Sequence, residues 1–261
     1  MGKITDALKK ATNERVERFE KISKIKERDK LIIKKIDGSK VDPRIITYFD
    51  SKALITEQYK ILRTNVLSSN KIKSPKILVV TSSLHSEGKT ITSLNLAVTM
   101  AQSASKPKIL LIDADLRRGR MEKYLGVEQD KGLTEILTGE IKPSEALFNI
   151  DLDNLAFIAS GAVPENPVEL LGSDVMKQFL NNMKVEFDHI IIDTPPIISV
   201  ADSGIVGAIS DGVLMVIQAG RTQRGIVKRA TELLQQTHSK ILGHVLTNIE
   251  YHLPEYIYRY L

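Results

Sequence analysis

Short runs of apolar and β-branched residues recur along most of the chain, and a segment with helical periodicity separates each run from the next. The runs that read as strands occupy residues 76–81, 108–113, 155–158, 189–193, 212–218 and 240–248. The segments that read as helices occupy residues 90–102, 168–183, 201–209 and 225–236. Near-continuous apolar strands that alternate with helices are typical of a parallel sheet covered on both faces. The pattern therefore predicts a doubly wound α/β fold with a mainly parallel sheet.

The first 75 residues follow a different pattern. Residues 1–40 place their apolar side chains along one broad stripe at helical spacing, which predicts a long amphipathic arm. Residues 50–70 read as a second helix, and residues 71–75 as a short linker. We therefore expect helical arms in front of a body at residues 76–250, which is followed by a short tail at residues 251–261.

The positive charge of the chain is concentrated in the predicted arm. Residues 1–40 hold 13 Lys and Arg against seven Asp and Glu, whereas the whole chain has a net charge of only +5. The body shows no basic stripe with interleaved aromatic residues, so we predict no nucleic-acid partner. The arm could be a solvated support, a membrane-surface anchor or a docking helix for another protein. Its acids and its lack of Trp favour protein docking.

Three absences restrict the class of protein. The chain has no cysteine and no apolar run close to the roughly 18 residues that a membrane span needs. Its charged N-terminus lacks the apolar segment of a secretory signal. We therefore expect a soluble, cytoplasmic protein without disulfides or thiolate metal sites.

The strongest chemical signal is the segment Ser-Leu-His-Ser-Glu-Gly-Lys-Thr at residues 83–90, between a predicted strand and a predicted helix. In this context backbone N–H groups face a phosphate, Lys89 reaches the β- and γ-phosphates, and the Thr90 hydroxyl binds Mg²⁺. The predicted nucleotide contacts are Ser86, Glu87, Gly88, Lys89, Thr90 and Thr92. An ordinary strand-to-helix turn is the alternative, because Ser83 replaces a glycine of the strict pattern.

Carboxylates follow two of the other predicted strands. Asp113 and Asp115 end one apolar run with side chains that point the same way, and Asp193 ends another. Ligands of such folds bind at the carboxyl ends of the strands, and a magnesium nucleotide would compensate the negative charge there. Each aspartate could instead cap the helix that follows it.

Together these segments resemble the Walker A, Walker A′ and Walker B motifs of the bacterial tyrosine kinases (BY-kinases). The motifs occupy residues 81–90, 112–118 and 193–196, and the likeness extends over most of residues 43–261. BY-kinases belong to exopolysaccharide and capsule loci and share the P-loop NTPase fold of the cell-division and plasmid-partition ATPases. The resemblance implies an ATP-dependent protein-tyrosine autokinase that regulates polymerisation or export of such a polysaccharide.

The resemblance also implies roles for individual residues. Lys89 would bind the ATP phosphates, and Asp113 would be the catalytic base that accepts the tyrosine proton, with Arg117 steadying charge nearby. Asn248, after the last strand, would contact the nucleotide base. The implied ligands of Mg²⁺ are Thr90, Asp115 and Asp193.

Assembly and partners follow from the same resemblance. Residues 41–75 would be an oligomerisation segment and linker, in which Lys60 replaces the first Arg of the family's Glu-x-x-Arg-x-x-Arg motif. The family likeness implies a homo-oligomer and a membrane-embedded activator that recruits the chain to the inner face of the membrane. The first rival function is a partition-type ATPase switch, but Leu84 stands where those proteins carry their signature lysine. The second is an interaction protein whose nucleotide is only structural, but the presence of Asp113, Asp115 and Asp193 argues against it.

Four of the seven tyrosines lie in the last eleven residues. They are Tyr251, Tyr256, Tyr258 and Tyr260. Their close spacing in a terminal segment suits successive phosphoacceptors. The alternative is that neighbouring apolar side chains dock the segment and that the tyrosine rings only pack.

Overall fold

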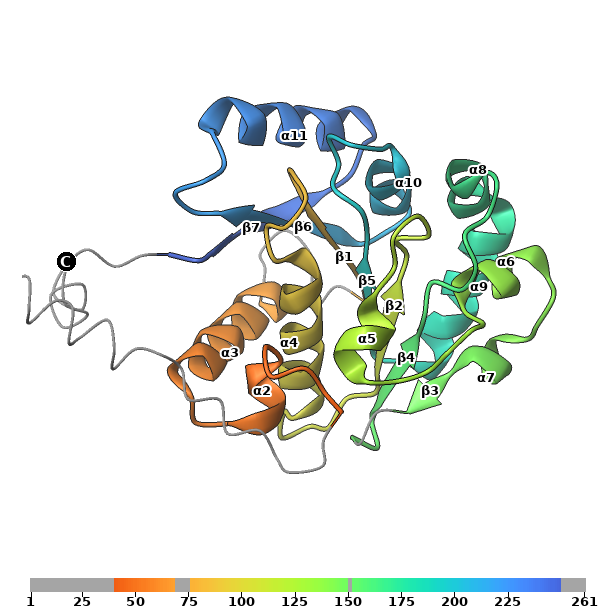
Figure 1. Ribbon diagram of the computed structural model, residues 1–261, viewed down its shortest axis with the longest axis horizontal. Coiled ribbons are helices and arrows are strands. Elements are labelled where there is room, and N and C mark those ends of the chain that lie inside the picture. The colour runs from red at the N-terminus through yellow and green to blue at the C-terminus, as the bar shows by residue number, and fades with distance from the viewer. Residues whose placement is uncertain (1–39, 69–75, 150–151, 250–261) are drawn as a thin grey trace, which may run out of the picture. The chain divides into compact units, whose positions relative to one another are not determined.

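The computed structural model describes residues 40–68, 76–149 and 152–249. A seven-stranded sheet with the order β3-β4-β2-β5-β1-β6-β7 forms the centre of this part of the chain (Figure 1). The strands are β1 (Ile77–Ser82), β2 (Ile109–Asp113), β3 (Phe148–Asn149), β4 (Leu155–Ile158), β5 (His189–Asp193), β6 (Gly212–Gln218) and β7 (Ile241–Thr247). Paired strands are parallel except β3, which is antiparallel to β4. The predicted mainly parallel sheet is confirmed.

Three predicted segments lie wholly or almost wholly outside the described residues. They are the arm at residues 1–40, the linker at residues 71–75 and the tail at residues 251–261. Among the helices of the three described ranges, none is both long enough and apolar enough to cross a membrane.

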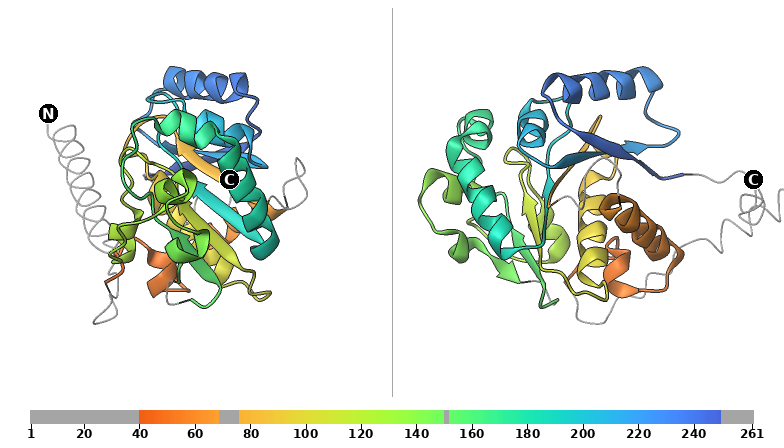
Figure 2. Two further views of the ribbon diagram at one scale, coloured as in Figure 1. Left: turned by 90° about the vertical axis from the view of Figure 1, so that its right-hand side faces the viewer. Right: turned by 180° about the vertical axis from the view of Figure 1, so that it is seen from behind.

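Alternating side chains of the central strands divide the core into two layers, one on each face of the sheet. In β1, Ile77 and Val79 face one layer, and Leu78 and Val80 face the other. The Leu78 layer is covered by α2 (Ile46–Phe49), α3 (Leu54–Leu67), α4 (Lys89–Ala101) and α5 (Met121–Leu125). The Ile77 layer is covered by α6 (Leu133–Thr138), α7 (Pro143–Ala146), α8 (Pro167–Gly172), α9 (Asp174–Glu186), α10 (Asp202–Ala208) and α11 (Arg224–Gln236). Helices on both faces make the fold doubly wound, as predicted (Figure 2).

Two helical predictions need correction. The helix predicted at residues 168–183 is two helices, because Ser173 has an extended backbone (φ −68°, ψ 158°) between α8 and α9. The Met176 N–H donates a 3.2 Å hydrogen bond to the Ser173 hydroxyl, so Ser173 caps the start of α9. The helix predicted at residues 50–70 begins later, at Leu54, and α2 precedes it.

The segment that precedes β1 in the sequence packs directly on α4. Arg63 of α3 donates a 2.8 Å hydrogen bond to the carbonyl of Thr99, and the Thr47 hydroxyl donates to the side chain of Asn95 over 3.0 Å. Asn95 in turn donates to the carbonyl of Arg44 over 3.0 Å. These contacts attach α2 and α3 to the helix that follows the phosphate loop.

Candidate active site

The carboxyl ends of β2, β5 and β1, which are neighbours in the sheet, carry the candidate site. The predicted phosphate loop joins β1 to α4, and two of its residues have left-handed backbone: Ser86 with φ 64° and Gly88 with φ 93°. Glycine suits the second position, because side chains disfavour a positive φ. These turns allow α4 to begin at Lys89, immediately after the loop.

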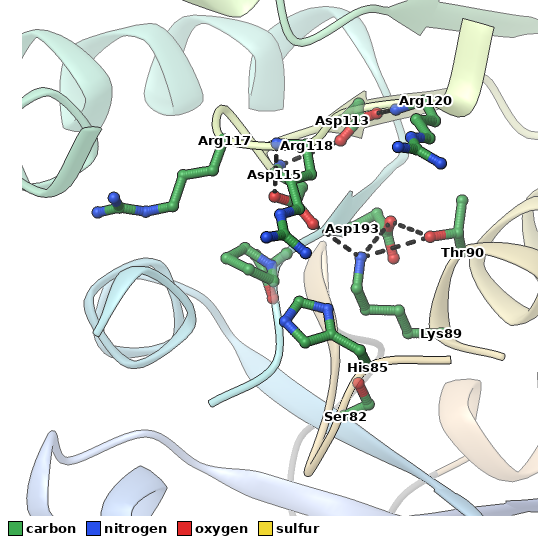
Figure 3. A network of polar contacts seen from close by, with 12 residues as sticks. Ser82, His85, Lys89, Thr90, Asp113, Asp115, Arg117, Arg118, Arg120 and Asp193 are labelled. Atoms are coloured by element: carbon green, nitrogen blue, oxygen red, sulfur yellow. Dashed lines mark hydrogen bonds and ion pairs between the residues drawn. The ribbon is translucent and has the colours of Figure 1, made fainter. Parts of the chain in front are cut away.

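An ammonium group and two carboxylates meet at this edge of the sheet (Figure 3). Lys89 Nζ lies 3.2 Å from Asp193 Oδ2 and 3.3 Å from Asp115 Oδ2. Burial disfavours the charged ammonium, but the attraction of Asp193, Asp115 and Asp113 outweighs burial and raises the pKa of Lys89 above its ordinary value. Lys89 is therefore a cation at neutral pH.

Two hydroxyl groups of α4 hold the carboxylate of Asp193. Thr90 Oγ1 donates to Asp193 Oδ2 over 2.7 Å, and Ser93 Oγ donates to Asp193 Oδ1 over 2.9 Å. Burial nevertheless raises the pKa of Asp193, although Lys89 and both hydroxyls favour its charged form. The sequence interpretation missed Ser93. Its position four residues after Lys89, on the same face of α4, was the available signal.

The side-chain oxygen atoms of this cluster are suitable ligands for a magnesium ion. Thr90 and Asp193 are in direct contact, and the carboxylates of Asp193 and Asp115 approach the same ammonium group, so the three side chains face one point. Mg²⁺ is usually held by one or two carboxylates together with phosphate oxygens and water. The described residues contain no group of three or more His, Cys, Asp or Glu side chains arranged around a metal, and this kind of site needs none.

Asp113 has a different set of partners. Its Oδ1 accepts a 3.0 Å hydrogen bond from the N–H of Asp115, and its Oδ2 accepts 3.1 Å bonds from the N–H groups of Arg120 and Met121. Burial, followed by the nearby charge of Asp193, raises the pKa of Asp113 to about 7. Backbone groups thus fix this carboxyl in place, and its pKa suits proton transfer near neutral pH.

Gly119 makes room for this arrangement. A Cβ atom at Gly119 would lie 2.2 Å from Ser160 Oγ and 3.0 Å from Asp113 Oδ2. Only glycine therefore allows the loop after β2 to pass between these two side chains. The sequence interpretation did not identify Gly119 or Ser160, because their proximity depends on the pairing of β2 with β4.

Comparisons with known proteins identify the family of this chain. Residues 76–244 match a protein family described as an AAA domain. The tyrosine-protein kinase YwqD of Bacillus subtilis (strain 168) is 36% identical over 216 residues, which cover 83% of this chain and 90% of YwqD. The chain belongs to the bacterial tyrosine-protein kinases. The kinase domain of the Escherichia coli tyrosine kinase ETK has a similar structure, with a TM-score of 0.75 and 29% identity over 87% of this chain and 89% of that one.

The fold itself is shared more widely than this family. A plasmid partition protein from Borrelia burgdorferi aligns with a TM-score of 0.52 and 21% identity, over 72% of this chain and 88% of that one. At that identity the likeness concerns the fold alone. The kinase relatives therefore define the family, and the partition protein does not.

The structure does not bring every predicted kinase residue to the cluster. Arg117 forms an ion pair with Asp202 of α10, with Nε 2.9 Å from Oδ2, and its side chain is directed away from Asp113 and Asp115 (Figure 3). The Asp202 partner raises the pKa of Arg117 and opposes the effect of burial. Arg117 therefore connects the loop after β2 to α10.

The other predicted nucleotide residues differ in their surroundings. The Thr92 hydroxyl is buried, and it lies beside the Tyr59 phenol of α3, whose pKa burial raises. Asn248 is exposed just after β7 and has a left-handed φ of 54°. Glu87 is buried and accepts a 2.7 Å hydrogen bond from the N–H of Leu84. The four predicted phosphoacceptor tyrosines, Tyr251, Tyr256, Tyr258 and Tyr260, lie outside the described residues.

Proposed function

We propose that this chain is an autokinase that transfers the γ-phosphoryl group of ATP to tyrosines of its own C-terminal tail. The observation that carries the proposal is the meeting of Lys89, Asp113 and Asp193 at one sheet edge in a member of the bacterial tyrosine-kinase family. A cation for the phosphates, a carboxylate for the metal and a base for the phenol are the groups that phosphoryl transfer needs.

The phosphate loop would bind the nucleotide. The backbone N–H groups of Ser86, Gly88 and Lys89 would donate hydrogen bonds to the phosphate oxygens, and the Lys89 ammonium would approach the β- and γ-phosphates. Asn248 would contact the base. Magnesium, when bound, would neutralise phosphate charge, and its protein ligands would be Thr90, Asp115 and Asp193.

Asp113 would serve as the catalytic base. The tyrosine oxygen attacks the γ-phosphorus, the bond from that phosphorus to the β,γ-bridging oxygen breaks, and ADP leaves with the electron pair. The phenolic proton passes to the Asp113 carboxylate, which its pKa of about 7 makes a stronger base than an ordinary aspartate. Arg117 would support this step by holding the loop after β2 against Asp202.

The tail and the partners complete the proposal. We place the acceptors at Tyr251, Tyr256, Tyr258 and Tyr260, and we expect one subunit's tail to enter its neighbour's site within a homo-oligomer. Residues 41–75 would contribute to that assembly. A membrane-embedded activator would hold this cytoplasmic chain at the inner face of the membrane, where it would regulate polymerisation or export of an exopolysaccharide or capsule.

Incubation with Mg-ATP followed by phosphosite mass spectrometry tests this function. Wild-type protein should gain phosphate on the tail tyrosines, and Lys89→Met should gain none while staying folded. Replacing the four tail tyrosines with Phe should remove nearly all phosphotyrosine. Labelling that maps instead to Tyr48, Tyr59 or Tyr124 would contradict the acceptor assignment. ATP hydrolysis without any phosphotyrosine would favour the partition-type switch.

A further inference from the structure

Glu87 is buried although it lies within the phosphate loop, and its carboxylate is held from two sides. Oε2 accepts the hydrogen bond from the Leu84 N–H, and Oε1 accepts one from the hydroxyl of Thr222. Thr222 belongs to the connection between β6 and α11, far from the loop in sequence. The side chain of Glu87 therefore ties the phosphate loop to a separate part of the fold.

A second threonine holds the backbone of the same residue. Thr247, the last residue of β7, donates a 2.7 Å hydrogen bond from Oγ1 to the carbonyl of Glu87. Its methyl group lies 3.4 Å from the position that a Cβ atom would take at Gly88. Thr222 and Thr247 thus fix both the side chain and the backbone of Glu87.

The residues on either side of Glu87 need such support. Ser86 and Gly88 both have left-handed backbone, with φ values of 64° and 93°. A non-glycine residue in that conformation costs on the order of 1–3 kcal/mol and persists only where its surroundings determine it. Arg221, next to Thr222, adds a 3.3 Å hydrogen bond to the carbonyl of Ser86. The anchor therefore lies where the loop conformation is least favourable by itself.

We propose that Thr222 and Thr247 are positioning residues of the nucleotide site. By holding Glu87 they keep the backbone N–H groups of the phosphate loop directed toward the phosphates, without touching the nucleotide themselves. Glu87 acts in this account as the anchor of the loop. This inference rests on the proposed binding of a magnesium nucleotide at the loop.

Isothermal titration calorimetry with Mg-ADP tests the inference on the full chain. Thr222→Val keeps the shape of the side chain and removes the hydroxyl, so the Kd should rise about tenfold or more, as expected for loss of a hydrogen bond to a charged group. Thr222→Ser retains the hydroxyl and should bind within about threefold of wild type. Thr247→Val should raise the Kd less, by severalfold, because the hydrogen bond that it removes is to a neutral carbonyl, and Thr247→Ser should again bind close to wild type.

Two controls separate positioning from a general loss of structure. Thr231→Val removes a hydroxyl from α11 that donates a 2.9 Å hydrogen bond to the Val227 carbonyl of the same helix, and it should leave the Kd unchanged. In a double-mutant cycle, Thr222→Val and Glu87→Ala should be non-additive, because each substitution removes the hydrogen bond between the Thr222 hydroxyl and the Glu87 carboxylate.

Three results would count against these conclusions. Wild-type affinity in both valine variants would overturn the inference, and so would equal weakening in each matched valine and serine pair. Absence of Mg-ADP binding by the folded wild-type protein would instead overturn the proposed function itself.

Discussion

Three aspartates share one edge of the sheet, yet their hydrogen bonds give each a different chemical character. The Asp193 carboxylate accepts hydrogen bonds from two hydroxyls and an ammonium group, whereas the Asp113 carboxylate accepts them from three backbone N–H groups. Asp115 contacts Lys89 and accepts a 3.1 Å bond from the N–H of Arg118. Side-chain donors can rearrange around a metal ion, but backbone donors cannot. This difference separates Asp193, a proposed metal ligand, from Asp113, the proposed base.

The Asp113 carboxyl should therefore set the pH dependence of phosphorylation. Burial and the charge of Asp193 raise the pKa of Asp113 to about 7, so the carboxyl is protonated, and inactive as a base, below that pH. We expect kcat/KM to rise through pH 7 and to level off about one unit above it. The midpoint for kcat should lie lower, because bound Mg²⁺ favours the carboxylate. A kcat/KM profile without a rise across this range would contradict the assignment.

Substitution with asparagine should separate Asp113 from Asp115. Asp113→Asn removes the base and should lower the phosphorylation rate at saturating Mg-ATP on the order of 10²–10⁴-fold. Asp115→Asn removes a metal ligand and should mainly weaken Mg-nucleotide binding, by about tenfold or more. Calorimetry and single-turnover labelling of both variants check this. An unchanged rate in Asp113→Asn would remove that residue from the catalytic role.

Sequence reasoning at this scale identified the residues whose type and position in a motif specify chemistry. Lys89, Asp115 and Asp193 were predicted together, and the structure places them in contact. Sequence reasoning could not show that Arg117 would form an ion pair with Asp202, which lies 85 residues away in the chain. It also could not identify Ser160, whose approach to Gly119 arises from strand pairing. Such contacts depend on the tertiary fold and leave no local signal.

At the scale of elements, the strands were easier to predict than the helices. Buried parallel strands are nearly continuous apolar runs, so each of the six predicted strands is present with bounds that shift by at most one residue. A helix break depends on one residue: Ser173 interrupts an otherwise periodic stretch. The two-residue strand β3 carries too little pattern to be predicted, and it forms only because β4 lies beside it.

The Ser173 cap gives a stability prediction for α9. Ser173→Ala removes the acceptor for the Met176 N–H and should lower the free energy of unfolding by about 1 kcal/mol. Ser173→Thr should retain most of the stability, because a threonine hydroxyl can accept from the Met176 N–H and donate to the Leu170 carbonyl as serine does. Ser105→Ala, at an exposed serine of a surface loop, is the control and should change stability by less than about 0.5 kcal/mol. Chemical denaturation measures all three, and equal stability of the two alanine variants would exclude the capping role.

At the scale of the whole molecule, the α3 helix combines contacts within the subunit with exposed apolar side chains. Arg63 bonds to α4, and Lys60 pairs with Glu57 of its own helix at 2.6 Å. Leu54 and Ile61 are more than half exposed. The charged residues of the predicted oligomerisation motif thus have partners within the subunit, while apolar side chains remain available to a neighbour.

Removal of the basic arm should separate assembly from nucleotide binding. Deletion of residues 1–40 removes none of the proposed site residues, so the Kd for Mg-ADP should stay within about twofold of the full chain. Self-association, measured by light scattering, or activator-dependent phosphorylation should fall, because the apolar stripe that the sequence predicts for the arm would need a protein partner. Arm-dependent flotation with anionic liposomes, with unchanged self-association, would show that the arm binds membranes instead.

The order of the strands has a consequence for how the chain becomes active during synthesis. β5 lies between β1 and β2 in the sheet, although it follows both in the chain. A ribosome-bound chain that ends before His189 therefore cannot bring the β1 and β2 edges into their final spacing, and it also lacks Asp193. Parallel pairing over such distances is slow and comes late in folding. Nascent or truncated chains should consequently remain unable to use ATP until the centre of the sheet has closed.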